Sequence, residues 1–472
     1  MTTGRARTSI EVLPGARRLV NSLRNMSYDF VRAVADLIDN SIQANANVVN
    51  IKMEFDGDHS WVRIADNGTG MTSDELTEAM RYGSERYYSS NELGRFGLGM
   101  KTASFSQCRK LTVASRKKDD EESIEIRQWN LDLIDQTNTW QVGDIPVEEY
   151  SEVLTAPLHK HPGTVVLWEH LDRLLKFKPP DGERARKWFN RTKGELDEHL
   201  GMVFHRFLAG EIEGKDKVTI TINDTEVISW DPFARSEPET TILPEKELEI
   251  KTDGHSVRAK YSPFILPTQA KFSSQSAFKR SAGPAKWNSQ QGLYIYRENR
   301  MIQGGGWCRL KAMDEHSKYA RAALDIDADA DMVMMLDVTK STVQLPPELR
   351  DQLKPLIVSL VSASESRYRS SKRGDWSRHG YKDQGLHEVD KEKIHRNDDV
   401  QNSTTQKAPV NDRGSSYTIF SGQAEEQKGK YRSLGIVIEN AADMAGEISA
   451  LNRIKAALNA EEPDIARELG WS

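Results

Sequence analysis

The chain has 472 residues, of which 29% are charged and 37% hydrophobic, and its formal net charge is −6. This length predicts two or three domains, and the mean hydropathy of −0.64 indicates that part of the chain lies outside a packed core. The sequence argues against a membrane-spanning protein, because its longest apolar stretches, such as residues 356–361, are far shorter than the roughly 18 residues that cross a bilayer.

Two further features narrow the class of protein. The first 18 residues include basic side chains but no apolar run after them, so they do not resemble a secretory signal. Cys108 and Cys308 are too few to form a disulfide framework or a cysteine zinc site, and we expect a cytoplasmic protein. The near-neutral charge argues against a uniformly basic nucleic-acid surface but permits a local basic patch.

Residues 1–180 mix helical and strand-like patterns and are predicted to form the first domain. Apolar residues recur at helical spacing over residues 30–42, and Asp36 and Asn40, four positions apart, share the polar face of that helix. Alternating stretches bounded by turn residues predict strands. These strands cover residues 48–55, 61–65, 111–115 and 164–168.

The rest of the chain divides by composition into three parts. Residues 181–365 are predicted to form a second domain. Residues 366–430 contain few apolar side chains and are predicted to be a disordered linker, and residues 431–472 are predicted to form a helical tail. In the second domain the patterns predict helices at 185–207 and 347–362 and strands at 218–222, 292–296 and 333–338.

The strand at residues 61–65 leads into a candidate ligand-binding loop. Asp66 is followed by Gly68, Gly70 and Met71, so a carboxylate stands beside backbone that can bend closely around a ligand. A carboxylate accepts hydrogen bonds and suits an exocyclic amine such as that of adenine. Taken alone, this loop is equally consistent with a tight turn, and the polar helix face with a solvated surface.

A glycine-rich segment follows at residues 94–101, ahead of a predicted helix at 102–107. Glycines let backbone N–H groups approach phosphate oxygens, and a helix N-terminus and a lysine add positive charge. The order Gly-Met-Lys-Thr differs from the Walker A pattern, and glycines this far from the first strand differ from a dinucleotide-binding fold. By itself the segment is unspecific, as is the Gly163-Thr164 pair before the strand at 164–168.

In this order and spacing, the elements together resemble the ATPase superfamily of gyrase, heat-shock chaperones, histidine kinases and MutL, called GHKL. Residues 35–41 are similar to its N box, the Asp66 loop to its first glycine box, residues 94–101 to its second, and Gly163-Thr164 to its last motif. The resemblance implies an α+β fold with a Bergerat-type α/β sandwich ATP-binding domain, and it implies ATP and Mg²⁺ as cofactors.

The resemblance also assigns roles to single residues. Asn40 is expected to ligate Mg²⁺, Asp66 to accept a hydrogen bond from the adenine amine, and Thr164 to lie behind the adenine. Residues 94–101 are expected to form a lid, with Lys101 near the phosphates. The implied cofactor-binding residues are Asn40, Asp66, Gly68, Gly70, Met71, Gly94, Gly97, Leu98, Gly99, Met100, Lys101 and Thr164.

Asp36 departs from the family pattern. It stands where hydrolytic members carry a glutamate general base, and one methylene less withdraws the carboxylate by about 1.5 Å. Geometry at that scale can change a rate by about a hundredfold. Either the site has adjusted to the shorter side chain, or turnover is slow and ATP serves mainly as a conformational switch. We expect slow hydrolysis, with Asp36 as the base.

The second domain resembles the transducer domain, of ribosomal-protein-like α+β fold, that follows the ATPase domain in gyrase, MutL and MORC proteins. The resemblance lies in residues 292–302 and 336–346, and it makes Lys340 the candidate catalytic lysine that reaches the γ-phosphate. A flexible ammonium suits that sensing role. Two ordinary strands and a surface lysine are the alternative interpretation of the same residues.

Within the superfamily the sequence resembles MORC-like ATPases most, through the Asp66 loop, Gly83-Ser84, the run at residues 94–101 and the Tyr-Arg-x-Asn-Arg strand. This implies ATP-dependent homodimers that clamp DNA, and prokaryotic relatives resemble components of antiviral defence or restriction loci. Basic and aromatic side chains are interleaved over residues 367–382. That pattern suits phosphate contact and base stacking, but it equally fits a solvated linker.

Three functions remain open at this point. The first is an ATP-gated clamp on DNA, and the second is the ATPase subunit of a larger topoisomerase- or restriction-type machine with partner subunits. The third is a chaperone-like ATPase that remodels protein clients. The third is disfavoured because such chaperones usually have a longer middle segment and a dedicated dimerisation domain.

Overall fold

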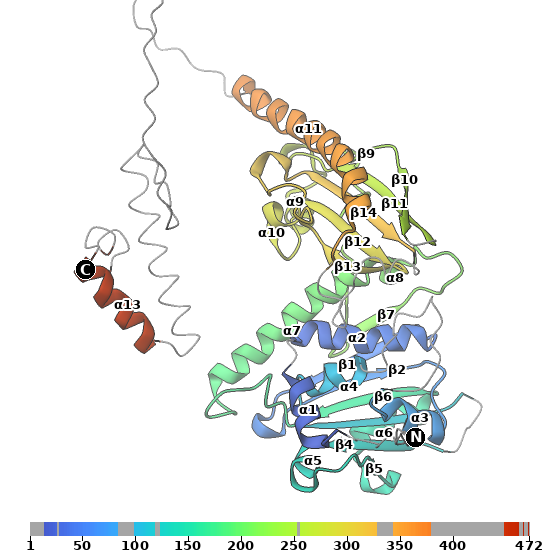
Figure 1. The fold of residues 1–472 in the computed structure, drawn as a ribbon. Coiled ribbons are helices and arrows are strands. Elements are labelled where there is room, and N and C mark those ends of the chain that lie inside the picture. Colours follow the sequence, from blue (N-terminus) through green and yellow to red (C-terminus); the bar gives the residue numbers. More distant parts are fainter. Residues whose placement is uncertain are drawn as a thin grey trace, which may run out of the picture. The chain divides into compact units, whose positions relative to one another are not determined.

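The chain forms two compact units, residues 1–383 and 384–472. Figure 1 shows that the first unit contains two domains, each built around a β-sheet. The computed structural model describes residues 14–25, 28–83, 99–118, 123–252, 255–327, 343–378 and 448–461, together with residues 466 and 471. The expected site residues Gly94, Gly97, Leu98 and Lys340, and the strand predicted at 333–338, lie outside the described residues.

The first domain contains an eight-stranded sheet in the order β5-β4-β3-β6-β2-β1-β7-β8. Its antiparallel centre places Ile51 opposite Ile64, and Ile64 opposite Val166. The strands predicted in this domain are thereby confirmed. The sheet is formed by β1 (Val48–Glu54), β2 (Trp61–Asp66), β3 (Lys110–Arg116), β4 (Glu125–Asn130), β5 (Gly143–Asp144), β6 (Gly163–Glu169), β7 (Thr219–Ile222) and β8 (Thr225–Glu226).

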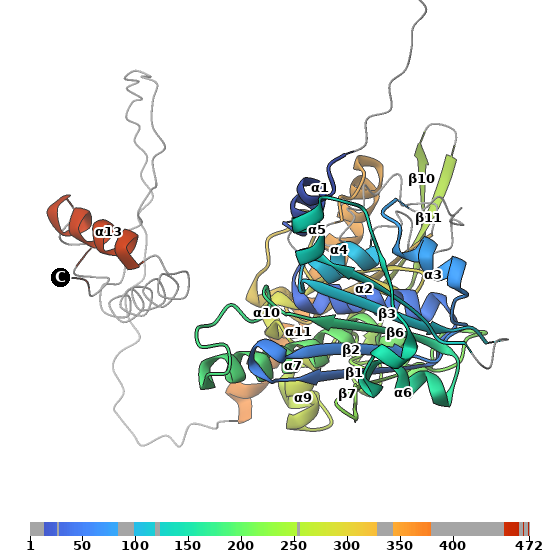
Figure 2. The same ribbon diagram turned by 90° about the horizontal axis from the view of Figure 1, so that it is seen from below.

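Helices cover both faces of this sheet. On one face α1, α2, α4 and α7 share a core with the strands, and on the other face α6 packs through Leu154 and Leu158 (Figure 2). The neighbours Ile64 and Ala65 enter these two different cores, because successive side chains of a strand point to opposite faces. The helices are α1 (Ala16–Arg24), α2 (Phe30–Gln43), α3 (Ser73–Met80), α4 (Gly99–Phe105), α5 (Leu131–Thr137), α6 (Glu152–Lys160), α7 (Glu183–Val203) and α8 (His205–Ala209).

The first domain extends beyond the boundary expected at residue 180. After α7, strand β7 returns to the first sheet and pairs in parallel with β1, so that Val49 lies opposite Ile220. Side chains of α7 such as Leu196 and Leu200 belong to the first core. The expected boundary was too early because an alternating strand pattern does not reveal which sheet the strand joins.

The second domain is built on a six-stranded sheet in the order β10-β11-β14-β12-β13, with β9 paired to β11. Between β12 and β13, Glu298 and Asn299 both have positive φ values, 49° and 66°, and make the tight turn of a hairpin. The strands are β9 (Thr241–Ile242), β10 (Lys246–Thr252), β11 (His255–Ile265), β12 (Gly292–Arg297), β13 (Arg300–Gly304) and β14 (Ala320–Ile326), and the helices are α9 (Gln275–Ser281), α10 (Lys286–Ser289) and α11 (Pro347–Arg378).

Helix α11 continues past residue 366, where a disordered linker was expected to begin. Its Arg367 guanidinium donates hydrogen bonds to the carbonyl oxygens of Glu239, Ile265 and Leu266, at 3.0, 3.0 and 3.1 Å. The expectation is wrong for residues 366–378, because an arginine can anchor a helix that has few apolar side chains. Residues 379–447 lie outside the described part of the chain.

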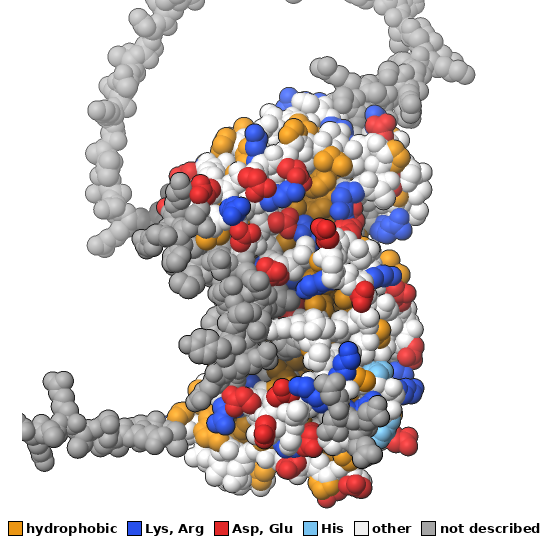
Figure 3. All heavy atoms as spheres, turned by 90° about the vertical axis from the view of Figure 1, so that its right-hand side faces the viewer, with side chains coloured by type: hydrophobic (Ala, Val, Ile, Leu, Met, Phe, Trp, Pro, Cys, Tyr) orange, Lys and Arg blue, Asp and Glu red, His pale blue; other side chains and the backbone are white. Residues whose placement is uncertain are grey.

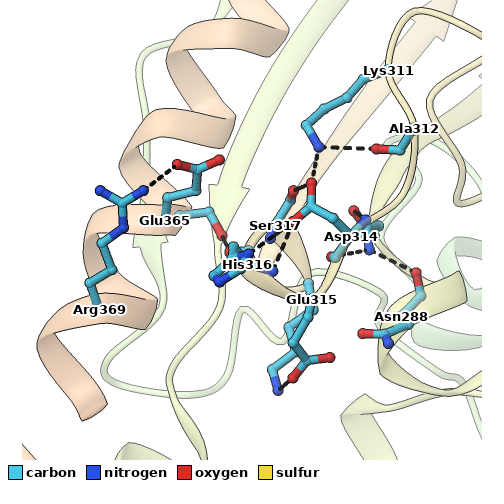
Figure 4. Close-up of polar contacts among 12 residues, drawn as sticks. Asn288, Lys311, Ala312, Asp314, Glu315, His316, Ser317, Glu365 and Arg369 are labelled. Atoms are coloured by element: carbon cyan, nitrogen blue, oxygen red, sulfur yellow. Dashed lines mark hydrogen bonds and ion pairs between the residues drawn. The ribbon is translucent and has the colours of Figure 1, made fainter. Parts of the chain in front are cut away.

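The end of α11 also packs against the single turn η4 (Glu315–Ser317). Asp314 caps this turn by accepting hydrogen bonds from the backbone N–H groups of His316 and Ser317, at 2.8 and 2.9 Å (Figure 4). The His316 ring meets the buried Tyr368 ring edge-on, with 4.9 Å between their centroids. Arg369, the residue after Tyr368, is paired with Glu365 one helical turn before it, at 3.3 Å.

In the second unit, helix α13 (Ile448–Glu461) lies within the tail that was expected to be helical. The Asn459 side-chain amide donates to the Trp471 carbonyl oxygen at 3.1 Å, and the Lys455 ammonium lies 5.3 Å from the Trp471 ring centroid. Across the described parts of the chain, none of the helices is long and apolar enough to cross a membrane.

We expect Arg367→Met to lower the free energy of unfolding by about 2 kcal/mol, because three carbonyl oxygens lose a charged donor. The matched variant Arg369→Met removes an exposed ion pair and should cost less than about 0.5 kcal/mol. Urea denaturation of both variants measures the difference. Equal stabilities would show that the Arg367 contacts do not anchor α11.

Candidate nucleotide site

Helix α2 carries two acids and an amide close together, and the two acids lie near Arg300 of the second domain. Asp36 and Asp39 are buried, with exposed fractions of 6% and 2%, whereas Asn40 is exposed. The Tyr28 hydroxyl donates a 2.5 Å hydrogen bond to Oδ2 of Asp36. The Nε of Arg300, on β13, lies 3.1 Å from both carboxylate oxygens of Asp39. The helix thus buries two carboxylates with strong partners and leaves one amide oxygen accessible.

Asp66, the last residue of β2, is buried and receives hydrogen bonds from three segments of the chain. Its Oδ1 accepts from the backbone N–H groups of Gly68 and Thr164, at 2.9 and 3.1 Å, and its Oδ2 accepts from the Ser41 hydroxyl at 2.9 Å. Burial raises the pKa of Asp66 above its usual value, while these hydrogen bonds oppose the rise. They therefore hold the carboxylate in one orientation.

The donors around Asp66 leave capacity for a ligand. An ionised carboxylate can accept about four hydrogen bonds, and the described donors Gly68, Thr164 and Ser41 supply three. The remaining lone-pair position on Oδ2 suits an amine donor such as the exocyclic group of adenine. The residue chemistry at this point fits an adenine nucleotide.

Two hydroxyl groups join the Asp66 loop to the strands beside it. Ser115 on β3 donates to the Gly163 carbonyl oxygen at 2.9 Å and accepts from the Met71 backbone N–H at 2.9 Å. The Thr164 hydroxyl lies 3.0 Å from that of Ser115. These contacts connect Met71 and Thr164, which the sequence placed in separate motifs, through Ser115, which it did not single out.

The glycines near Asp66 serve close packing of the backbone. Gly70 has φ of +65°, and a Cβ atom there would lie 1.9 Å from the Arg116 carbonyl oxygen. Gly163 has φ of +146°, and its Cβ would lie 2.0 Å from the Asp66 carbonyl oxygen. Any side chain at either position would force these strand ends apart. The fold itself therefore requires both glycines, whether or not a ligand binds.

Lys101 is located away from this hydrogen-bond network. It lies on α4 with its side chain buried, and its ammonium donates to the Ala79 carbonyl oxygen of α3 at 2.8 Å. Burial lowers the pKa of Lys101 to about 8. Gly99 and Met100 open α4 and are partly exposed. The described structure therefore gives Lys101 a partner on α3 rather than on Asp66 or α2.

The metal-binding potential of the site rests on a single side chain. In the described ranges, no group of three or more His, Cys, Asp or Glu residues is arranged to hold a metal ion. Mg²⁺ that binds together with nucleotide phosphates needs only one or two protein ligands and keeps several waters. The exposed Asn40, on the same helix as Asp36, has the oxygen ligand that this mode of binding requires.

A separate cavity of about 500 Å³ lies near the start of α2. Its lining includes Tyr28, Arg173 and Trp188 but neither Asp66 nor Asn40. It is therefore distinct from the network around Asp66, although Tyr28 borders it and also contacts Asp36.

Sequence patterns missed four contributors to this region, namely Tyr28, Asp39, Ser41 and Arg300. Ser41 and Asp39 lie within the N-box segment, so their closeness in sequence to Asp36 and Asn40 could have indicated that they contribute to the site. Arg300 is the last residue of the Tyr-Arg-x-Asn-Arg strand, but nothing in that motif indicates its pairing with Asp39, which lies 261 positions away in the sequence.

Comparison with known proteins identifies relatives of the first domain. Residues 28–163 match the family described as "Histidine kinase-, DNA gyrase B-, and HSP90-like ATPase". The DNA mismatch repair protein MutL of Pseudoalteromonas translucida is 27% identical over 241 residues, which are 50% of this chain and 34% of MutL. The chaperone protein HtpG of Cronobacter sakazakii is 22% identical over 275 residues, which are 46% of this chain and 42% of HtpG.

The HtpG of Escherichia coli K12 is also 22% identical over 275 residues. The chain therefore spans well under half the length of each of these relatives, 34% of MutL and 42% of HtpG.

We expect Ser41→Ala to raise the Kd for ATP by about tenfold, since a hydroxyl donor to a buried carboxylate is lost. The Ser41 hydrogen bond lowers the pKa of Asp66, so its removal raises that pKa further. Protonation turns the carboxylate from an acceptor into a donor. ATP affinity should therefore begin to fall at a higher pH in the variant than in the wild-type chain.

The control is Ser60→Ala, which removes an equally buried hydroxyl in the connection between β1 and β2. Calorimetric titration of ATP across neutral to acidic pH measures both variants. If Ser41→Ala binds ATP as tightly as Ser60→Ala at every pH, Ser41 does not support the nucleotide.

Proposed function

We propose that the chain, whose residues 28–163 form a domain of the histidine kinase-, DNA gyrase B- and HSP90-like ATPase family, binds ATP with Mg²⁺ and hydrolyses it slowly. The main support for this proposal is the buried Asp66 carboxylate. Residues of β6, α2 and its own loop donate hydrogen bonds to it, and one acceptor position remains for a ligand. Asp66 recognises the adenine amine, and Thr164 supports it from β6.

Asn40 is the proposed Mg²⁺ ligand. Its exposed amide oxygen lies one helical turn beyond Asp36, so the ion and the base can approach the same phosphate. Mg²⁺ supplies charge neutralisation at the phosphates when it is bound. The segment at residues 94–101 is the proposed lid, and Lys340 the proposed γ-phosphate sensor. Lys101 can serve the lid only if its ammonium leaves the Ala79 carbonyl oxygen.

Asp36 is the proposed general base for the attacking water. Tyr28 donates to Oδ2 of Asp36 and Nη2 of Arg300 lies 3.9 Å from Oδ1, so both carboxylate oxygens are oriented, and Oδ1 is the proposed proton acceptor. A fixed base within reach of water contributes about 10²–10⁴-fold in rate. Because aspartate is shorter than glutamate by one methylene, we expect a contribution near the lower limit of this range and therefore a slow turnover.

Asp36→Asn should lower the single-turnover rate of ATP hydrolysis by about a hundredfold, since an amide cannot take up the proton. The amide oxygen can still accept from Tyr28, so the Kd for ATP should change little. Asp29→Asn is the matched control, because Asp29 caps α2 by accepting from the Arg32 N–H and an asparagine caps equally well. An unchanged rate in Asp36→Asn would exclude Asp36 as the base.

For the wider role we propose a MORC-like clamp that ATP-driven homodimerisation closes on DNA, in a defence or restriction setting. One similar protein is named for DNA mismatch repair and another as a chaperone, so the relatives alone leave two classes open. The ribosomal-protein-like resemblance of the second domain favours the DNA clamp. An ATPase subunit of a larger topoisomerase- or restriction-type machine, acting with partner subunits, is the second candidate.

The distribution of charged side chains limits the surfaces to which DNA could bind. On the described part of the face in Figure 3, basic and acidic side chains are interspersed. Arg367 and Tyr368, which were expected to belong to a basic DNA-binding linker, are packed into the second domain. We therefore do not propose Arg367 and Tyr368 as DNA contacts. The proposed contacts are the later basic residues of the stretch, Lys372, Arg373, Arg378 and Lys382.

Plasmid DNA should stimulate ATP hydrolysis, and ATP should shift the sedimenting species to a dimer. Because phosphate contacts release counterions, DNA binding should weaken steeply as salt rises. An Asn40→Ala chain should show neither response. Stimulation by an unfolded protein instead of DNA would support a chaperone, and no response to either would indicate a missing partner subunit.

A further inference from the structure

The tip of the β12–β13 hairpin brings a second-domain arginine to the proposed catalytic helix. Arg300 follows the tight turn at Glu298 and Asn299 and is 5% exposed. Its Nη1 donates to the Met301 carbonyl oxygen at 3.0 Å, which ties the guanidinium to its own strand. A movement of the hairpin therefore moves this charge with it.

The guanidinium of Arg300 faces both buried acids of α2. Its Nε lies 3.1 Å from each carboxylate oxygen of Asp39, and its Nη2 lies 3.9 Å from Oδ1 of Asp36. The Tyr28 hydroxyl occupies the other oxygen, Oδ2. Asp36 is thus held between a first-domain hydroxyl and a second-domain cation, with Asp39 anchoring that cation.

The surroundings keep this cation directed at the carboxylates. The Phe204 ring centroid lies 5.6 Å from the guanidinium carbon of Arg300. Burial, with the nearby charges of Arg300 and Arg32, lowers the pKa of His199 to about 3. His199 is therefore neutral near pH 7 and does not compete with Arg300 for Asp39.

We propose that Arg300 is a positioning residue for ATP hydrolysis, which places Oδ1 of Asp36 only while the β12–β13 hairpin is seated on α2. This inference rests on the proposed ATPase function and adds to it a control by the second domain. The short aspartate base makes the rate sensitive to small shifts, since about 1 Å of misplacement can cost a hundredfold. Unseating the hairpin would then stop hydrolysis without displacing the adenine contacts of Asp66.

The test compares Arg300 with a second arginine at the same junction. Arg206, on α8, stacks on the Tyr296 ring at 3.7 Å and pairs with Asp325, at 3.1 Å from Nη2. Among the described residues, Arg206 forms its ion pair with Asp325 of the second domain and not with an acid of α2. Arg206 also donates to Oδ1 of Asn299 in the hairpin turn, at 3.2 Å. Arg206→Met therefore removes a junction contact but leaves the Arg300–Asp39 pair that seats the hairpin on α2, whereas Arg300→Lys keeps a charge but loses the planar guanidinium that spans Asp39 and Asp36.

We expect Arg300→Lys to lower the single-turnover rate by about 10- to 100-fold, with the Kd for a non-hydrolysable ATP analogue within about threefold of wild type. Arg206→Met should keep the rate within about threefold. Thermal unfolding establishes that each chain is folded, and calorimetry measures the Kd. A folded Arg300→Lys chain with the wild-type rate would overturn the proposal, as would an equal loss of rate in Arg206→Met.

A second variant guards against failure to fold, because removing one partner leaves an uncompensated buried charge. Arg300→Met combined with Asp39→Asn removes both charges, and it should fold, bind the analogue and hydrolyse ATP as slowly as Arg300→Lys. The wild-type rate in this double variant would also overturn the proposal. If the wild-type chain binds ATP but does not hydrolyse it, the proposed function fails and the Arg300 inference with it. A failure of the Arg300 inference alone leaves wild-type hydrolysis intact.

Discussion

A carboxylate that is buried away from water needs hydrogen-bond donors, and three segments of the chain supply them to Asp66. The Ser41 hydroxyl comes from α2, the Thr164 N–H from β6 and the Gly68 N–H from its own loop. The end of β2, the start of β6 and the last turn of α2 must meet at this point for the charge to be stabilised. The same meeting fixes where Asn40 emerges, so the placement of the whole proposed nucleotide site follows from the burial of one acid.

The two acids of α2 are stabilised differently, and the difference connects the domains. Asp39 is almost fully buried and is matched by the guanidinium of Arg300, a full charge from another domain. A buried ion pair contributes little net stability, but loss of one partner is costly. The pair therefore acts mainly to specify how the β12–β13 hairpin meets α2. It also makes the surroundings of Asp36 dependent on a contact from outside the first domain.

Local patterns predicted α2, the strands β1, β2, β3 and β6 and the loop at Asp66, because strand alternation, helical spacing and turn glycines are short-range signals. They did not predict α1, β4, α5, β5 or α6 of the same domain. They could not predict that β7 joins the first sheet, since pairing Val49 with Ile220 is a long-range choice. Nor could they predict that Arg367 anchors α11, because composition counts an arginine as solvated even when its head binds three carbonyl oxygens. The motif identified Asp36 and Asn40 but not the cation beside them.

Both ends of the eight-stranded sheet are formed by two-residue strands, β5 and β8. Such short edges offer few unpaired backbone groups to another chain, and β8 exposes both Thr225 and Glu226. Short, polar edge strands are a common defence against strand-to-strand association. In the described part of the first domain, continuation of the sheet from one copy into the next is therefore disfavoured at either edge.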